Sequence, residues 1–266
     1  MKYLVSFSGG KDSTAMLLHM LELKYPIDEV INIDTGMEFP AMYAHIAQIR
    51  KIVEDAGIKF TVIKAEKDFE YYLLKHPYTS RDGISHTGYG WTRSRNRWCT
   101  AFLKVAPMRK HCKKHYQGEK IIHYVGIAAD EQYRLERQSN KYHIHPLVEW
   151  GWTEKDALEY CYSKGFYFGG LYNIFKRVSC WCCPLQSLEE LRKLQANFPD
   201  LWEYLKELES KGDMSFRNNE SVPMLEGRFN LERERARKGL TINPHTKEFR
   251  EALKEVYSKY PPPPEY

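Results

Sequence analysis

Segments with strand character and segments with helix character alternate from residue 3 to residue 74, and this alternation limits the fold more than any other feature. Apolar runs typical of buried strands occupy residues 3–7, 29–34 and 59–64. Between them, apolar residues recur at helical spacing from Ser13 and again from Pro40 to Gly57, and residues 69–74 suit a short helix. Strands that alternate with helices form parallel sheets with right-handed crossovers. The sequence therefore predicts an α/β fold with a doubly wound, mostly parallel sheet.

The rest of the chain continues this sheet and then becomes helical. A helix is expected around residues 107–116, followed by strands at 121–126 and 143–147. Further helices are indicated by two capping-box patterns, Thr153 with Asp156 and Ser187 with Glu190, and by the amphipathic stretch 199–211. We therefore expect an α/β domain over 1–150, a helical extension over 151–212 and a charged tail over 213–266 that ends in a disordered proline-rich segment.

The turn Ser8-Gly9-Gly10-Lys11-Asp12-Ser13 joins the first strand to the first helix. Its two glycines can take positive φ and let an anion approach the backbone, and the N–H groups that open the helix carry partial positive charge. Two hydroxyls and the side chain of Lys11 add donors. The pattern favours a phosphate-binding turn, the alternative being an ordinary strand-to-helix connection. Its spacing excludes the nucleotide-binding loop G-x-x-x-x-G-K-[ST].

Polar residues also follow two other strands. In doubly wound sheets ligands bind at the carboxyl ends of the strands, so residues 34–36 should share a pocket with the turn, and Asp34 could contact a ribose or adenine. After the strand 121–126, Asp130 and Glu131 could bind Mg²⁺ or a hydroxyl. Arg134 or Arg137 could bind a phosphate or sulfate. The alternative for these acids and arginines is surface ion pairing.

Basic side chains are crowded between residues 81 and 115, although the formal net charge of the chain is only +5. Residues 77–97 lack periodicity and interleave Tyr89 and Trp91 with arginines. We expect an irregular loop that closes over a phosphorylated substrate or stacks on bases, the alternative being a flexible insertion. A field of this sign favours a polyanion, either nucleotide phosphates or nucleic acid, and a solvated basic face is the alternative.

Three of the six cysteines lie within Cys180-Trp181-Cys182-Cys183. The spacing of Cys180 and Cys183 gives half of a four-ligand metal site. Cys99 is the candidate for completing it from elsewhere, and Cys182 could be a fourth ligand. Zinc and a [4Fe-4S] cluster both accept four cysteines, so the count leaves the metal open. A metal-free redox or packing cluster is the remaining alternative.

With 42% hydrophobic and 28% charged residues, the 266-residue composition is that of an ordinary globular protein. No apolar run approaches the roughly 20 residues that cross a bilayer, and Met1 leads directly into a strand. We expect a cytoplasmic protein without a leader or a membrane partner.

The turn at residues 8–13 resembles the SGGxDS signature of the PP-loop superfamily, whose members bind ATP or a related adenine nucleotide and usually cleave between the α- and β-phosphates. Three more blocks resemble, in order, those of the phosphoadenylyl sulfate (PAPS) reductase branch: Asp34-Thr35-Gly36-Met37-Glu38-Phe39-Pro40, Trp98-Cys99-Thr100 with Lys104 and Pro107, and Gly126 followed by Asp130-Glu131 and Arg134. The blocks cover roughly the first half of the chain.

The resemblance implies a Rossmann-like PP-loop fold in which Lys11 and Asp12 are catalytic and Mg²⁺ accompanies the nucleotide. The nucleotide would be bound by Ser8, Gly9, Gly10, Lys11, Asp12, Ser13, Asp34, Thr35, Gly36, Gly126 and Arg134.

Iron-sulfur clusters recur among sulfate-nucleotide reductases and among PP-loop enzymes that thiolate tRNA or DNA. The resemblance therefore implies a [4Fe-4S] cluster held by Cys99, Cys180 and Cys183, with Cys182 or a substrate sulfur in the fourth place, and makes zinc the less favoured metal. The sequence departs from cluster-bearing reductases in having one cysteine, Cys99, where those enzymes have two.

Two reactions and one binding function fit these features. In the favoured reaction, ATP adenylates the substrate and releases pyrophosphate, and a sulfur nucleophile then displaces AMP. In the alternative, a cysteine thiolate attacks the sulfur of phosphoadenylyl or adenylyl sulfate and sulfite eventually leaves. Such reductases carry their nucleophile in a Glu-Cys-Gly motif, and no cysteine follows Cys183 here. The third interpretation is a non-catalytic nucleotide or nucleic-acid-binding module.

Two kinds of macromolecular partner are expected. One is a tRNA or DNA acceptor that binds through the basic residues 81–115, and the other is a sulfur donor or reductant protein. The sequence leaves the acceptor and the oligomeric state open.

Overall fold

The computed structural model describes residues 1–80, 83–137 and 140–261. Arg81, the side chain of Arg137 and Pro262–Pro264 of the expected proline-rich end lie outside the described residues. The chain divides into two compact units, each formed by two separate segments. Unit 1 consists of residues 1–68 and 100–180, and unit 2 of residues 69–99 and 181–266. These units cut across the expected domain boundaries at 150 and 212.

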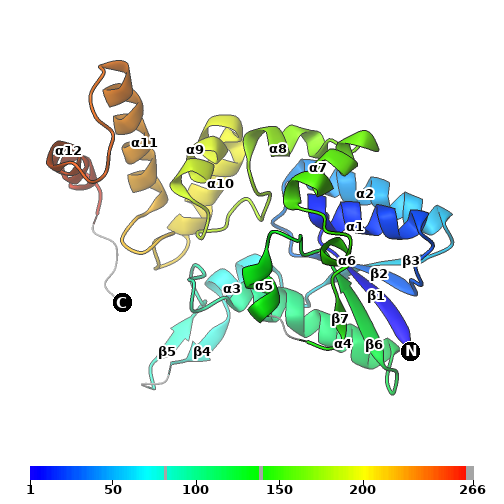
Figure 1. Ribbon diagram of the computed structural model, residues 1–266. Helices are drawn as coiled ribbons and strands as arrows, with labels where there is room; N and C mark the ends of the chain where they lie inside the picture. Colours follow the sequence, from blue (N-terminus) through cyan, green and yellow to red (C-terminus); the bar gives the residue numbers. More distant parts are fainter. Residues whose placement is uncertain (81–82, 138–139, 262–266) are drawn as a thin grey trace. The chain divides into compact units, whose positions relative to one another are not determined.

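Unit 1 is built on a parallel sheet (Figure 1). Its strands are β1 (Lys2–Phe7), β2 (Glu29–Asp34), β3 (Lys59–Lys64), β6 (Ile121–Val125) and β7 (His143–Ile144), in the order β3-β2-β1-β6-β7. All four neighbouring pairs are parallel. The doubly wound α/β prediction is therefore confirmed. The last strand is shorter than expected because Pro146 begins a helix at a position where proline is favoured.

Helices cover both faces of this sheet (Figure 1). On one face lie α1 (Lys11–Glu22) and α2 (Pro40–Asp55), and on the other lies α4 (Ala106–His115), which follows the π-helix η1 (Cys99–Val105). Short helices α5 (Gln132–Arg137) and α6 (Pro146–Glu149) flank β7 in the chain. Next come α7 (Glu154–Ser163), the 3-10 turn η2 (Phe168–Gly170) and α8 (Leu171–Ile174). The expected capping box of Thr153 and Asp156 begins α7.

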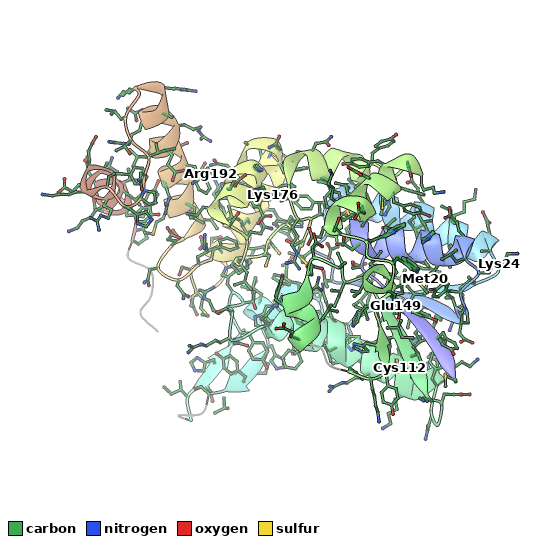
Figure 2. All side chains as sticks on the ribbon, in the orientation of Figure 1. Met20, Lys24, Cys112, Glu149, Lys176 and Arg192 are labelled. Carbon is green, nitrogen blue, oxygen red and sulfur yellow. The ribbon has the colours of Figure 1, made fainter. Side chains whose placement is uncertain are left out.

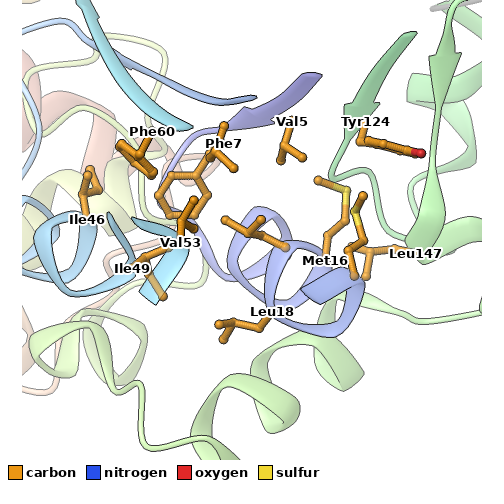
Figure 3. Packing of buried hydrophobic residues seen from close by; sticks show 13 residues of the cluster. Val5, Phe7, Met16, Leu18, Ile46, Ile49, Val53, Phe60, Tyr124 and Leu147 are labelled. Carbon is orange, nitrogen blue, oxygen red and sulfur yellow. The ribbon is translucent and has the colours of Figure 1, made fainter. Parts of the chain in front are cut away.

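The core of unit 1 lies between the sheet and helices α1 and α2 (Figure 3). Val5 and Phe7 of the central strand meet Met16 of α1 and Ile49 of α2, each at most 2% exposed. The apolar side chains of α1 from Met16 to Met20, the last of which is labelled in Figure 2, therefore hold this helix against the sheet.

A buried carboxylate ties α4 to the sheet. Glu29, at the start of β2, is 0% exposed. Its oxygens accept hydrogen bonds from Lys59 (2.7 Å), His111 (2.9 Å) and Tyr116 (2.7 Å), and also from Thr61. Burial alone would raise the pKa of Glu29, but these donors outweigh burial and lower it to about 2. The ionised side chain therefore stabilises the fold.

Unit 2 contains a hairpin and a set of helices. The hairpin pairs β4 (Pro77–Thr79) with β5 (Ser85–Thr87) in antiparallel fashion, within the stretch expected to be irregular. The helices are α3 (Phe69–Leu74), α9 (Leu188–Asn197), α10 (Pro199–Ser210), α11 (Val222–Arg237) and α12 (Lys247–Tyr257). The expected capping box of Ser187 and Glu190 begins α9. Large buried side chains such as Trp202, Phe216 and Phe229 form the interior of this unit.

Candidate functional site

The sheet of unit 1 changes direction between β1 and β6. From β1 the chain proceeds to β2 on one side, whereas β6 is followed by β7 on the other. In open parallel sheets ligands bind in the crevice outside the carboxyl ends of the strands at such a switch point. The turn at residues 8–10 follows β1 directly, and Gly126 follows β6. The topology therefore brings two of the predicted binding segments to one position.

The turn is shaped by its glycines and serines. Gly9 has φ +83°, and Gly10 precedes α1 with φ −69° and ψ 164°. The Ser13 hydroxyl donates to the carbonyl of Gly10 (3.0 Å), and its oxygen accepts the N–H of Ser8 (3.3 Å). No side chain caps α1 through Gly10. The serines thus hold the turn in shape, and the start of the helix carries a partial positive charge.

Gly126 is required because the backbone approaches it closely. A Cβ atom at this position would lie 2.9 Å from both N and Cα of Ser13 and 3.1 Å from the carbonyl carbon of Asp12. Only a residue without a side chain lets the end of β6 lie against the first turn of α1. Gly126 therefore sets the distance between the two segments.

Lys11 is buried beside two carboxylates. Its side chain is only 7% exposed, and its ammonium group pairs with Asp12 (2.9 Å) and with Glu154 of α7 (3.1 Å). The side chain therefore extends from the first turn of α1 toward α7. Burial raises the pKa of Asp12, the charges of Glu154 and Glu131 add to this, and Lys11 opposes it. The lysine charge is thus offset by carboxylates.

Tyr172 of α8 contacts the first amide of the helix. The N–H of Lys11 donates to its hydroxyl oxygen at 2.8 Å. Three consecutive left-handed residues, Phe168 (φ +52°), Gly169 (φ +60°) and Gly170 (φ +79°), precede α8 and turn the chain back toward the site. Burial raises the pKa of Tyr172, so the phenol keeps its proton and can donate it. Tyr172 was not predicted from the sequence, in which the nearby Gly169-Gly170 pair was the available signal.

A buried histidine supports the turn from the side of α2. Thr14 Oγ1 lies 3.3 Å from the carbonyl of Gly9 and 2.9 Å from Nε2 of His45. Burial lowers the pKa of His45 to about 4, so the imidazole is neutral at neutral pH. The contacts from His45 through Thr14 hold the Gly9 carbonyl in place. This role of His45 was not predicted from the sequence.

The residues after β2 are joined to neighbouring side chains and backbone by hydrogen bonds. Asp34 accepts hydrogen bonds from the N–H of Gly36 (2.8 Å), the hydroxyl of Tyr43 (3.0 Å) and the ammonium of Lys64 (2.9 Å). Burial would raise the pKa of Asp34, but these donors lower it. The hydroxyl of Thr35 lies 3.5 Å from a carboxylate oxygen of the nearby Glu38. Asp34 therefore fixes the turn that ends β2.

The residues after β6 form ion pairs and a helix cap. Arg134 donates to both carboxylate oxygens of Glu131 at 2.9 and 2.7 Å. Asp130 accepts the N–H of Glu154 at the start of α7 (3.0 Å). Arg134 and Glu131 therefore form an ion pair with each other, which was the alternative to ligand binding for these residues.

The candidate metal ligands belong to both units. In unit 1, the thiol of Cys180 donates to Glu38 (3.4 Å) and lies 3.8 Å from the hydroxyl of Thr35. In unit 2, Cys182 is 1% exposed, and the thiol of Cys99 lies 4.0 Å from the hydroxyl of Thr92. Over residues 1–80, 83–137 and 140–261, no three His, Cys, Asp or Glu side chains form a group that could hold a metal ion. The metal assignment stays a prediction.

The fold and the glycine turn at the switch point define an α/β protein of the PP-loop type. The model of the phosphoadenosine phosphosulfate reductase domain matches residues 2–186, and the chain belongs to this family.

Three comparisons describe its similarity to individual proteins. The uncharacterized protein MJ0066 of Methanocaldococcus jannaschii is 27% identical over 208 residues, which are 75% of this chain and 40% of that protein. MJ0973 of the same organism is 29% identical over 206 residues, 74% of this chain and 45% of that protein. The chain thus spans less than half the length of these relatives. The uncharacterized nin region protein ORF290 of Escherichia phage lambda is 29% identical over 170 residues, 58% of this chain and 56% of that protein.

Among solved structures, the U34-tRNA thiolase NcsA from Methanococcus maripaludis with its [4Fe-4S] cluster resembles the chain with a TM-score of 0.37 and 15% identity. The alignment covers 79% of this chain and 71% of NcsA. In the part of the sequence that the structure describes, no helix has both the length and the apolar character needed to cross a membrane.

Proposed function

We propose that the chain binds ATP at the switch point between β1 and β6 and uses it to adenylate a substrate, with release of pyrophosphate, before a sulfur nucleophile displaces AMP. The observation that carries this proposal is the start of α1, which follows a Gly-Gly turn, has a glycine as its N-cap residue and lies against Gly126. Backbone N–H groups in this arrangement bind phosphate. Membership of the family supports an adenine nucleotide as the ligand.

Side chains around the turn would complete the phosphate site. The Tyr172 hydroxyl accepts the N–H of Lys11, so its own proton is available for a phosphate oxygen. Lys11 would act from the first turn of α1, where its ammonium group pairs with Asp12 and Glu154. Developing charge on the leaving pyrophosphate would be stabilised by these donors and by the Mg²⁺ that accompanies ATP.

The chemistry proceeds in two substitutions. An oxygen of the substrate attacks the α-phosphorus, and the bond to pyrophosphate breaks. The sulfur nucleophile then attacks the activated carbon, and AMP leaves. The acceptor is proposed to be a tRNA or DNA bound through the basic residues 81–115, with a separate protein as the source of sulfur or electrons.

Reduction of phosphoadenylyl sulfate is the second candidate, and the description of the matched family favours it. In that reaction a thiolate would attack the sulfate sulfur and release adenosine 3′,5′-bisphosphate, leaving a thiosulfonate. A second thiol, from a dithiol reductant, would then attack the thiosulfonate, form a disulfide and release sulfite. The same amides would hold the 5′-phosphate.

Product analysis separates the candidates. The purified chain is incubated with bulk tRNA and DNA as acceptors, a dithiol reductant, and either ATP or phosphoadenylyl sulfate, and the products are identified by mass spectrometry. AMP and pyrophosphate support adenylation, whereas sulfite and the bisphosphate support reduction and contradict it. Binding of ATP with neither product set contradicts both reactions and leaves a binding module.

The proposed cluster has a separate test. Protein purified without oxygen is analysed for iron, sulfide and zinc, and Cys183→Ala is compared with Cys161→Ala, whose buried thiol donates to the carbonyl of Lys11. We expect iron and sulfide to be lost only from the Cys183 variant. Equal metal content in the two variants would contradict the assignment of Cys183 as a ligand.

A further inference from the structure

Four aromatic rings in unit 2 form a continuous stack from the interior to the surface. We call Trp98, Tyr89, Tyr78 and His86 the ring stack. Trp98 is 2% exposed, and His86 at the other end is exposed. Successive ring centroids are 6.1, 4.8 and 4.9 Å apart, and the planes differ by only 23°, 26° and 16°. The stack therefore ends at the solvent in a ring that is parallel to those behind it.

The hairpin holds the outer rings in place. Tyr78 of β4 and His86 of β5 are directly opposite each other in the register of the two strands. Nε2 of His86 lies 3.0 Å from the hydroxyl of Ser80, and Tyr89 is also stacked on His76 at 4.9 Å. Rings fixed in this way lose little freedom when another flat group is added.

The segment that contains the ring stack is basic in sequence. Residues 69–98 contain five lysines and arginines and only two acidic residues. Arg95 and Arg97 are exposed and form no ion pair with any carboxylate of the described residues. Arg93 is anchored, since it donates to the carbonyls of Ser215 (2.7 Å) and Phe216 (2.9 Å). The segment thus combines an exposed stacking ring with unpaired positive charge.

We propose that the ring stack binds an unpaired base of a single-stranded nucleic acid, with the base stacked on the outer rings and its phosphates near Arg95 and Arg97. Stacked aromatic rings combined with positive charge are the means by which proteins bind single strands without reading their sequence. A duplex, whose bases are already stacked on one another, offers no free base to these rings. The inference rests on the proposed function, because it names a single strand as the acceptor class.

Binding is tested without any nucleotide, so the result does not depend on turnover. Fluorescence anisotropy of a fluorescein-labelled single-stranded RNA of mixed sequence is measured at several salt concentrations. We expect His86→Ala to weaken binding by about 5- to 100-fold. The exposed His245, in the same unit, provides the matched control, and His245→Ala should bind as the wild type does. His86→Tyr keeps a ring and should restore binding.

The contributions of Arg95 and Arg97 are tested by the salt dependence of RNA binding. Arg95→Gln and Arg97→Gln should each weaken binding and reduce the slope of log affinity against log salt by about one, whereas exposed Arg237→Gln should not. Single-stranded DNA of the same sequence should bind with a similar dependence on His86, and a duplex should bind more weakly.

Three outcomes would overturn the proposal: absence of RNA binding, equal affinities of the His86→Ala and His245→Ala proteins, or a preference for the duplex. ATP binding is measured by calorimetry on the same His86→Ala protein. Normal ATP binding with unchanged RNA affinity refutes the ring stack and leaves the ATP site standing, whereas absent ATP binding in the wild type refutes the ATP site alone.

Discussion

Replacing Gly126 by alanine tests whether the end of β6 must lie as close to the first turn of α1 as it does. The new Cβ would lie 2.9 Å from N and Cα of Ser13. Carbon atoms in contact are normally about 3.5–4.0 Å apart, so the first turn of α1 would have to retreat by roughly 0.6–1 Å. Both contacts are with backbone atoms, and no side-chain rotation can relieve them.

Two consequences follow from this displacement. Overpacking of this kind costs about 1–3 kcal/mol of the free energy of unfolding. A shift of roughly 1 Å in the proposed phosphate-binding turn should lower turnover by about 100-fold. Urea unfolding measures the first effect, and pyrophosphate release with ATP titration calorimetry measures the second.

Gly10→Ala is the matched control for stability. At Gly10, with φ −69°, a Cβ would meet only the Tyr172 hydroxyl at 3.4 Å and Ser8 Oγ at 3.6 Å. These are ordinary contacts, so the free energy of unfolding should change by less than about 0.5 kcal/mol. If Gly126→Ala unfolds like the wild type and binds ATP with unchanged affinity, the close approach of β6 to α1 does not shape the site.

Three further substitutions probe the groups around the turn. Tyr172→Phe removes the hydroxyl that contacts the Lys11 amide, and calorimetry should show ATP affinity reduced about 5-fold, the equivalent of about 1 kcal/mol; unchanged affinity would exclude Tyr172 from the phosphate site. Glu154→Gln removes a negative charge beside Lys11 and should strengthen binding of ATP without Mg²⁺ several-fold, and weaker binding would contradict the assigned charge balance. Glu29→Gln should lose about 3 kcal/mol of stability at neutral pH, because the folded-state pKa of about 2 lies below the ordinary value of 4.5. That contribution is present above pH 4.5 and is lost as the pH falls toward 2, so urea midpoints of the variant and the wild type should converge in acid.

The sheet could be predicted from the sequence because its strands are short, apolar and separated by helical periodicity. The bounds of β2 and β3 agree with the expected segments 29–34 and 59–64. The β4–β5 hairpin was not predicted, since its strands have three residues each and do not alternate apolar with polar side chains. Its stability comes from stacked rings, which periodicity does not detect.

The site could be predicted only where it depends on local sequence. The glycine turn and its position after β1 follow from residues 3–13. The partners Tyr172, Glu154 and His45 lie far from the turn in the chain, for example 161 residues from Lys11 to Tyr172. A single sequence does not indicate such contacts. The burial of Lys11 depends on α7 packing against α1, which is likewise a tertiary effect.

The charges around the turn favour the backbone as the phosphate ligand. Lys11 and Arg134 carry two positive charges, whereas Asp12, Glu131 and Glu154 carry three formal negative charges, and the ion pairs join members of the two sets. A bare polyphosphate would gain little from side chains that are already neutralised. The first N–H groups of α1 meet no ionised group at the N-cap, because Gly10 has no side chain, and the N–H of Lys11 contacts only the neutral hydroxyl of Tyr172. On this charge balance, the proposed phosphate site depends more on the Gly-Gly turn and Gly126 than on the ammonium group of Lys11.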